Sequence, residues 1–108
     1  MAHYLVTAKP KSDLMEELLG NLRKNKYASM RPFGKALTYS LRNARLREDG
    51  YATWEEEEDY CSPPLAEERA AALDEFFDEL RVVPVQRGAG WAEIDHLTLL
   101  FPELKGKS

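Results

Sequence analysis

Alternating apolar and polar positions at the start of the chain predict a β-strand. Across residues 2–8, AHYLVTA, Tyr4 and Val6 fall on one face, while His3 and Leu5 fall on the other. A proline two positions beyond this segment ends the pattern. The first element is therefore expected to be a strand with one face in the core.

The next segment changes to a helical period. A helix is predicted from Ser12 or Asp13 to about Asn25, and Asp13 and Glu16 have the spacing of a capping box. Residues 26–34, KYASMRPFG, are predicted to be a loop. The apolar stripe of this helix consists of Leu14, Met15, Leu18, Leu19 and Leu22.

Residues 35–47 fit two patterns. As a helix, Leu37 and Leu41 share a face, and the Ala, Leu and Arg content is favourable. As a strand, Tyr39 lies between them on the same face. The dipeptide at 49–50, Asp-Gly, is a strong hairpin turn signal, and the β-like sequence YATW follows it. We therefore predict a strand over 35–47, with a helix as the alternative.

A two-residue turn at this dipeptide would fix the register of the hairpin, because facing positions would sum to 99. Arg45 would then lie opposite Trp54, and Arg42 opposite Glu57. A cation over an indole and an opposite-charge pair both stabilise a ladder.

A second helix is predicted from Ser62, which is an N-cap residue followed by proline at the first helical position. Its apolar positions recur with a helical period as far as Leu80 and include two adjacent phenylalanines. Residues 81–87, RVVPVQR, are predicted to be a strand, at an edge or with a bulge because of Pro84. After a glycine-rich turn, a short helical turn is expected over residues 95–100.

The predicted order is β-α-β-β-α-β followed by a short C-terminal appendix. This order resembles the ferredoxin-like plait, an α+β fold with two helices on one face of an antiparallel sheet. If residues 35–47 are helical, this description fails at the second strand. A length of 108 residues and a hydrophobic content of 44% suit a single domain, 1–108. The fold alone does not specify a function.

Charge is distributed unevenly along the chain. Residues 1–47 contain ten Lys and Arg and three acids, a net charge of +7, whereas residues 48–108 contain five bases and sixteen acids, a net charge of −11. We expect the halves to neutralise each other within the fold or across a homo-oligomer contact. The alternative is a nucleic-acid-binding N-terminal half, but a central strand with five acids would repel phosphate, so nucleic acid is not an expected partner.

Other features bear on the compartment. No apolar run approaches the ~18–20 residues of a membrane span, so no membrane partner is expected. The sequence has no secretory signal pattern, and a single cysteine, Cys61, cannot form an internal disulfide. A cytoplasmic protein is therefore expected. Cys61 is interpreted as a small apolar filler, and the alternative is a reactive thiol.

The acid run at residues 55–59 divides into two faces if it is a strand. Glu55 and Glu57 would form a solvated row with Asp59, neutralised by Arg42 and its neighbours. Glu56 and Glu58 instead share the side of Trp54 and Tyr60. If those aromatics face the core, both carboxylates are drawn inward, where burial would raise their pKa. A bulge would turn these charges outward, and a position beyond the cover of the helices would also leave them hydrated.

No metal or cofactor is predicted. Same-face residues of one strand are about 6.6–6.8 Å apart, whereas a hard cation needs several oxygens within about 2.0–2.6 Å. The chain has no calcium-loop, zinc-finger or phosphate-loop motif. No catalytic residue is assigned. The candidate binding residues are Tyr39, Asn43, Arg45, Trp54, Glu56 and Glu58.

Three functions follow from these patterns. The leading hypothesis is a small cytoplasmic protein that acts by self-association or protein-partner binding through the uncovered sheet face. The second is a small enzyme or ligand-binding module with a site near Glu56 and Glu58. The third is nucleic-acid binding through the basic N-terminal half.

Overall fold

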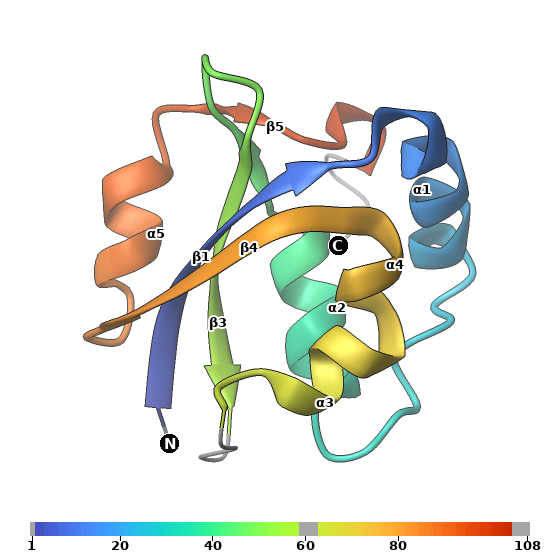
Figure 1. The fold of residues 1–108 in the computed structure, drawn as a ribbon, viewed down its shortest axis with the longest axis horizontal. Coiled ribbons are helices and arrows are strands. Elements are labelled where there is room, and N and C mark those ends of the chain that lie inside the picture. The colour runs from blue at the N-terminus through green and yellow to red at the C-terminus, as the bar shows by residue number, and fades with distance from the viewer. Residues whose placement is uncertain (1, 59–62, 105–108) are drawn as a thin grey trace.

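The computed structural model describes residues 2–58 and 63–104 (Figure 1). All strand pairs are antiparallel and form one five-stranded sheet in the order β4-β1-β3-β2-β5. The strands are β1 (Ala2–Pro10), β2 (Arg45–Leu46), β3 (Ala52–Glu58), β4 (Phe77–Val85) and β5 (Thr98–Leu99). The helical elements are η1 (Ser12–Leu14), α1 (Met15–Arg23), α2 (Gly34–Arg42), α3 (Ala66–Glu68), η2 (Arg69–Leu73), α4 (Asp74–Phe76), α5 (Ala89–Ile94) and η3 (Pro102–Leu104). In the described ranges, no helix has the length and apolar character needed to cross a membrane.

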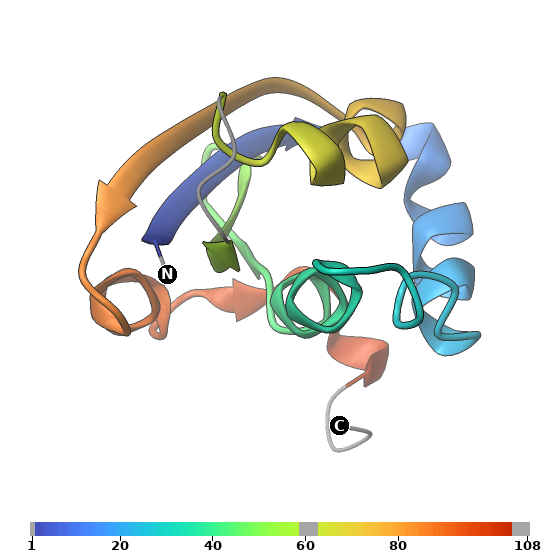
Figure 2. The same ribbon diagram turned by 90° about the horizontal axis from the view of Figure 1, so that it is seen from below.

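The core lies on the inner face of the sheet. Figure 2 shows the sheet arching over α2, with α1 at one end. Val6 and Trp54 face each other across β1 and β3 and are completely buried, and the Trp54 ring lies 5.2 Å from that of Phe77. The alternation predicted for the first strand is confirmed, because Tyr4 and Val6 face the core while His3 and Leu5 face outward.

The predicted strand over 35–47 is wrong, and the helical alternative is correct for most of the segment. Leu37 and Leu41 are fully buried on one face of α2. The strand is reduced to β2, Arg45–Leu46. Leucines four residues apart share a face in either conformation, and packing of the helix against β3 decides between them.

The hairpin register is also different from the prediction. Arg45 pairs with Thr53 and Leu46 with Ala52, one residue away from the expected pairing. The loop is closed by the N–H of Arg47, which donates to the carbonyl of Tyr51 at 2.8 Å, and Gly50 has a φ of 88°. This loop has three residues with a left-handed glycine, so Arg45 does not lie over Trp54.

Helical caps and the second helix differ from expectation. Neither η1 nor α1 has a side-chain N-cap, so the predicted capping box does not form. The helical segment after β3 begins at Ala66, includes the π-helical turn η2 and ends at Phe76, while Ser62 lies outside the described residues. β4 begins at Phe77, where the backbone becomes extended. This change of conformation allows both adjacent phenylalanines to be buried.

The C-terminal part covers some of the outer face that was predicted to be open. α5 replaces the expected turn at residues 88–90, and β5 forms in place of the expected helical turn over residues 95–100. Arg45 of β2 binds the segment between α5 and β5, because its Nη1 donates hydrogen bonds to the carbonyls of Asp95 (2.9 Å) and Leu97 (2.8 Å). The sheet thus has helices against both faces.

Candidate functional site

A cavity of about 480 Å3 lies on the outer side of β3, between α2 and α5. β2 pairs with β3 only at Ala52 and Thr53. Beyond Thr53, α2 packs against β3 in place of a neighbouring strand. The Ser40 hydroxyl donates to the Glu55 carbonyl at 2.8 Å and joins α2 to the strand. The cavity is lined by His3, Lys35, Ala36, Tyr39, Ser40, Glu55, Glu57, Arg87, Gly88 and Trp91.

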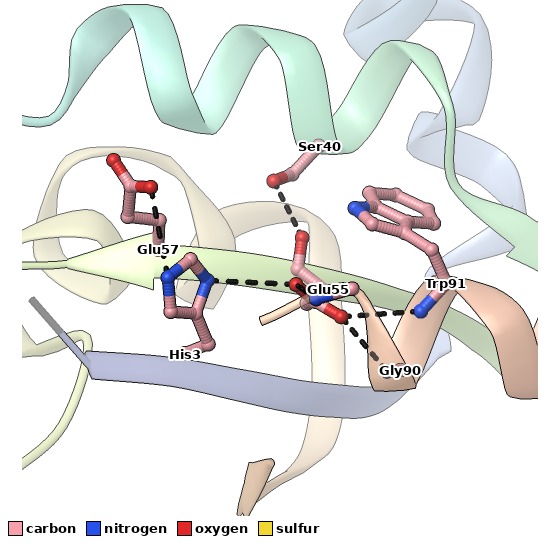
Figure 3. A network of polar contacts seen from close by, with 7 residues as sticks. His3, Ser40, Glu55, Glu57, Gly90 and Trp91 are labelled. Atoms are coloured by element: carbon pink, nitrogen blue, oxygen red, sulfur yellow. Dashed lines mark hydrogen bonds and ion pairs between the residues drawn. The ribbon is translucent and has the colours of Figure 1, made fainter. Parts of the chain in front are cut away.

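Glu55 forms the floor of this pocket (Figure 3). Its carboxylate is 4% exposed and accepts hydrogen bonds from three backbone N–H groups: Gly88 at 2.9 Å, Gly90 at 2.8 Å and Trp91 at 3.2 Å. These donors belong to the first turn of α5 and the residue before it, where a carboxylate replaces the missing helical acceptors. The prediction that Glu55 belongs to a solvated row is therefore wrong.

His3 lies between two carboxylates. Its Nδ1 is 3.5 Å from Oε2 of Glu55, and its Nε2 is 3.8 Å from Oε2 of Glu57 (Figure 3). The imidazole is 14% exposed. Glu57 is more accessible, at 39% of its side chain. The arrangement directs each ring nitrogen of His3 toward a carboxylate.

Two aromatic side chains form one wall. Tyr39 comes from α2 and Trp91 from α5, with ring centroids 6.1 Å apart at an interplanar angle of 87°. Tyr39 is 59% exposed. Lys35 lies one helical turn before Tyr39, and Arg87 precedes the first turn of α5. The pocket thus combines an aromatic corner with two exposed cations.

The six candidate binding residues do not converge on one site. Tyr39 lines the pocket, but the Asn43 side chain donates to the Tyr39 carbonyl at the end of α2. Arg45 is held by carbonyls of the C-terminal segment. Trp54, Glu56 and Glu58 lie together on the inner face of β3. The binding role of all six remains a prediction.

The predicted inward direction of Glu56 and Glu58 is confirmed. Glu56 is fully buried, and its Oε1 accepts a hydrogen bond from Trp54 Nε1 at 2.8 Å. Oε1 of Glu58 accepts one from the N–H of Leu65 at 2.7 Å. Glu68 from α3 is also buried, and Oε2 of each of these three glutamates has no hydrogen-bond partner among the residues that the structure describes.

Burial raises the pKa of Glu56 to about 8, against the opposing effect of the Trp54 hydrogen bond. The neighbouring charges of Glu68 and Glu58 raise this pKa further. Burial also raises the pKa of Glu68. Glu56 is therefore protonated at neutral pH. Nowhere in residues 2–58 and 63–104 do three or more His, Cys, Asp or Glu side chains form a group suited to a metal ion.

Glu56→Gln is expected to increase the free energy of unfolding at every pH above about 4.5. The folded pKa lies above the unfolded value of 4.5, so the parent loses stability as pH rises from about 4.5 to about 8. The variant has no proton to lose here, and we expect it to be more stable by roughly 3 kcal/mol at pH 7. Urea unfolding at pH 5, 7 and 8.5 measures this difference. Glu57→Gln, on the opposite face, is the control, and equal pH dependence of parent and Glu56→Gln would contradict the assignment.

No protein-family model, curated protein or solved structure matches the chain. His3, Lys35, Glu55, Arg87 and Trp91 were not identified as candidates from the sequence. The sequence does show a turn with two glycines before Trp91. The N–H groups of Gly88, Gly90 and Trp91, however, bind Glu55, which lies 33 to 36 residues earlier in the chain.

Proposed function

We propose that the protein binds a small organic molecule in the pocket between α2 and α5. The buried Glu55 carboxylate, held by three N–H groups, is the observation that carries this proposal. It fixes the α5 end and places Trp91 against Tyr39 around the cavity. A preformed hollow with an aromatic wall and a few polar groups is the usual form of a small-molecule site.

The contacts support binding in preference to a chemical step. The Ser40 hydroxyl donates to a backbone carbonyl, so its proton is already used. His3 directs both ring nitrogens to carboxylates. Neither side chain is paired with the other as a nucleophile and base, because His3 and Ser40 both point to Glu55.

The fold is proposed to be a variant of the ferredoxin-like plait. The order of its first four strands supports this proposal, because β3 lies between β1 and β2, and β1 lies between β3 and β4. In this variant α2 takes the place of most of the second strand. That replacement supplies the Tyr39 wall, so the departure from a regular plait and the pocket have a common origin.

Trp91→Ala and Tyr39→Ala are expected to weaken the binding of a pocket ligand at least tenfold. Each substitution removes an aromatic ring from the pocket wall. A contact between two aromatic rings contributes roughly 0.5–1.5 kcal/mol to the binding free energy beyond the burial of their area. Ligands are found by screening aromatic fragments against 15N-labelled protein, and affinities are measured by titration. Tyr51→Ala, outside the pocket, serves as the control. Fragments whose affinity is unchanged in Trp91→Ala and Tyr39→Ala would refute the site.

A second candidate function is self-association through the outer sheet face. Val83 of β4 is 55% exposed and, with Tyr39, is one of two exposed large hydrophobic side chains in the described residues. It faces Leu5, which borders an open groove of about 720 Å3 that also contains Ile94. A second copy of the chain would cover Val83 and the apolar side chains of Leu5 and Ile94.

Self-association predicts a change in oligomeric state when Val83 is made charged. Val83→Asp should lower the weight-average mass seen by sedimentation equilibrium at high protein concentration, because burial of the new charge is unfavourable. The control is Arg81→Ala, which removes a charge from an exposed position of the same strand. A parent that sediments as a monomer throughout excludes this candidate.

A further inference from the structure

We infer that the pocket ligand is a planar organic acid, a ring bearing a carboxylate or phosphate group; this inference rests on the proposed binding function. Some polar groups of the pocket are already paired within the protein, and others are not. Lys35 and Arg87 are exposed at the cavity, and neither has an ion pair or hydrogen bond within the described parts of the chain.

The two acids of the pocket have other partners than these cations. Glu55 has three backbone donors as partners and His3 beside it. Glu57 lies nearest to the other nitrogen of His3. The two carboxylates thus have partners within the protein, whereas the side chains of Lys35 and Arg87 have none among the described residues.

The unpaired cations come from opposite sides of the cavity. Lys35 belongs to α2, one turn from Tyr39, and Arg87 belongs to the segment leading into α5, close to Trp91. A guanidinium presents parallel N–H donors that match carboxylate or phosphate oxygens, and an ammonium adds a further charge. An anionic group near these side chains gains charge-assisted hydrogen bonds without displacing an existing partner.

The aromatic corner specifies the remainder of the ligand. Tyr39 and Trp91 meet edge to face, which leaves ring surface toward the cavity. A cavity of about 480 Å3 is within the usual size range for small-molecule sites. A planar ring can stack against Tyr39 and Trp91 while its acidic group binds Lys35 or Arg87.

Five probes test this inference: benzoate, phenyl phosphate, benzyl alcohol, benzylamine and inorganic phosphate. Each is titrated into 15N-labelled protein, with shifts followed at the backbone amides of Gly88, Gly90 and Trp91 and at the Trp91 indole N–H. We expect benzoate or phenyl phosphate to bind at least tenfold more tightly than benzyl alcohol. The better of the two anions identifies the acidic group. Inorganic phosphate that binds as tightly as phenyl phosphate would show that the ring is irrelevant and would overturn the inference.

Arg87→Met and Lys35→Met are expected to weaken benzoate or phenyl phosphate more than benzyl alcohol, by fivefold or more in relative affinity. Lys26→Met, which removes an exposed cation outside the pocket, is expected to leave the preference intact. Equal affinity for charged and neutral probes, or tighter binding of benzylamine, overturns the acid preference while the pocket proposal stands. If none of the probes perturbs the pocket resonances at millimolar concentration, both proposals are contradicted.

Discussion

Gly34→Ala is expected to destabilise the protein by about 3 kcal/mol or more. A Cβ at this position would overlap the carbonyl oxygen of Tyr27 and lie 2.9 Å from that of Ala28. Both are backbone atoms, so no side-chain rotation relieves the clash. Tyr27 is itself buried and accepts a hydrogen bond from Asn21, which fixes the loop against α1.

Gly20→Ala is the matched control for this substitution. Gly20 lies within α1, and a Cβ there would meet no atom within 4 Å. Alanine should therefore stabilise the helix by about 0.5–1 kcal/mol. Thermal unfolding followed by circular dichroism compares the two variants. A Gly34→Ala protein as stable as the parent would mean that α2 does not approach the 27–28 backbone as described.

Glu55→Ala is expected to cost about 3 kcal/mol and to release α5 from the sheet. The substitution leaves the buried N–H group of Gly90 and the part-buried N–H groups of Gly88 and Trp91 without their acceptor. Hydrogen exchange should show lost protection at Gly90 and Trp91, together with lower global stability. Ligand binding should fall as well, because Trp91 no longer has a fixed place beside Tyr39.

Glu57→Ala provides the comparison for Glu55→Ala. Glu57 lies two residues further along the same face of β3 and is 39% exposed, with its nearest charge on His3. Its removal should change stability by no more than about 0.5 kcal/mol. Similar losses of stability and of Trp91 protection in the two variants would contradict the role assigned to Glu55.

Local patterns predicted the parts of the fold that depend on local spacing. The two-residue period placed Tyr4 and Val6 in the core, and the same period placed Glu56 and Glu58 on the side of Trp54. The antiparallel sheet and mixed α+β class also follow from the order of such segments. These features require only the alternation of side chains along a strand.

Tertiary packing determines the parts of the fold that local patterns did not predict. Leu37 and Leu41 suit a helix and a strand equally, and the choice depends on how α2 fits between the loop at Gly34 and the edge of β3. The turn signal at Asp49 and Gly50 was correct as a turn but did not determine the length of the loop. A strong local signal thus extended the predicted strand too far.

The pocket was not predictable from neighbouring residues. Glu55 was interpreted as part of a uniform acid run, and only the distant turn before α5 distinguishes it from Glu57. His3 comes from β1, and Tyr39 and Trp91 come from two helices. The chemistry of this site arises from contacts among four segments, none of which contains a recognisable motif.

A crystal structure of the protein with its tightest-binding aromatic fragment is the most direct test of the proposed function. We expect the fragment between α2 and α5, stacked at the Tyr39 and Trp91 corner, with the Glu55 carboxylate still bound to Gly88, Gly90 and Trp91. Fragment density in the groove beside Leu5 and Ile94, with the pocket between the helices empty, would contradict it.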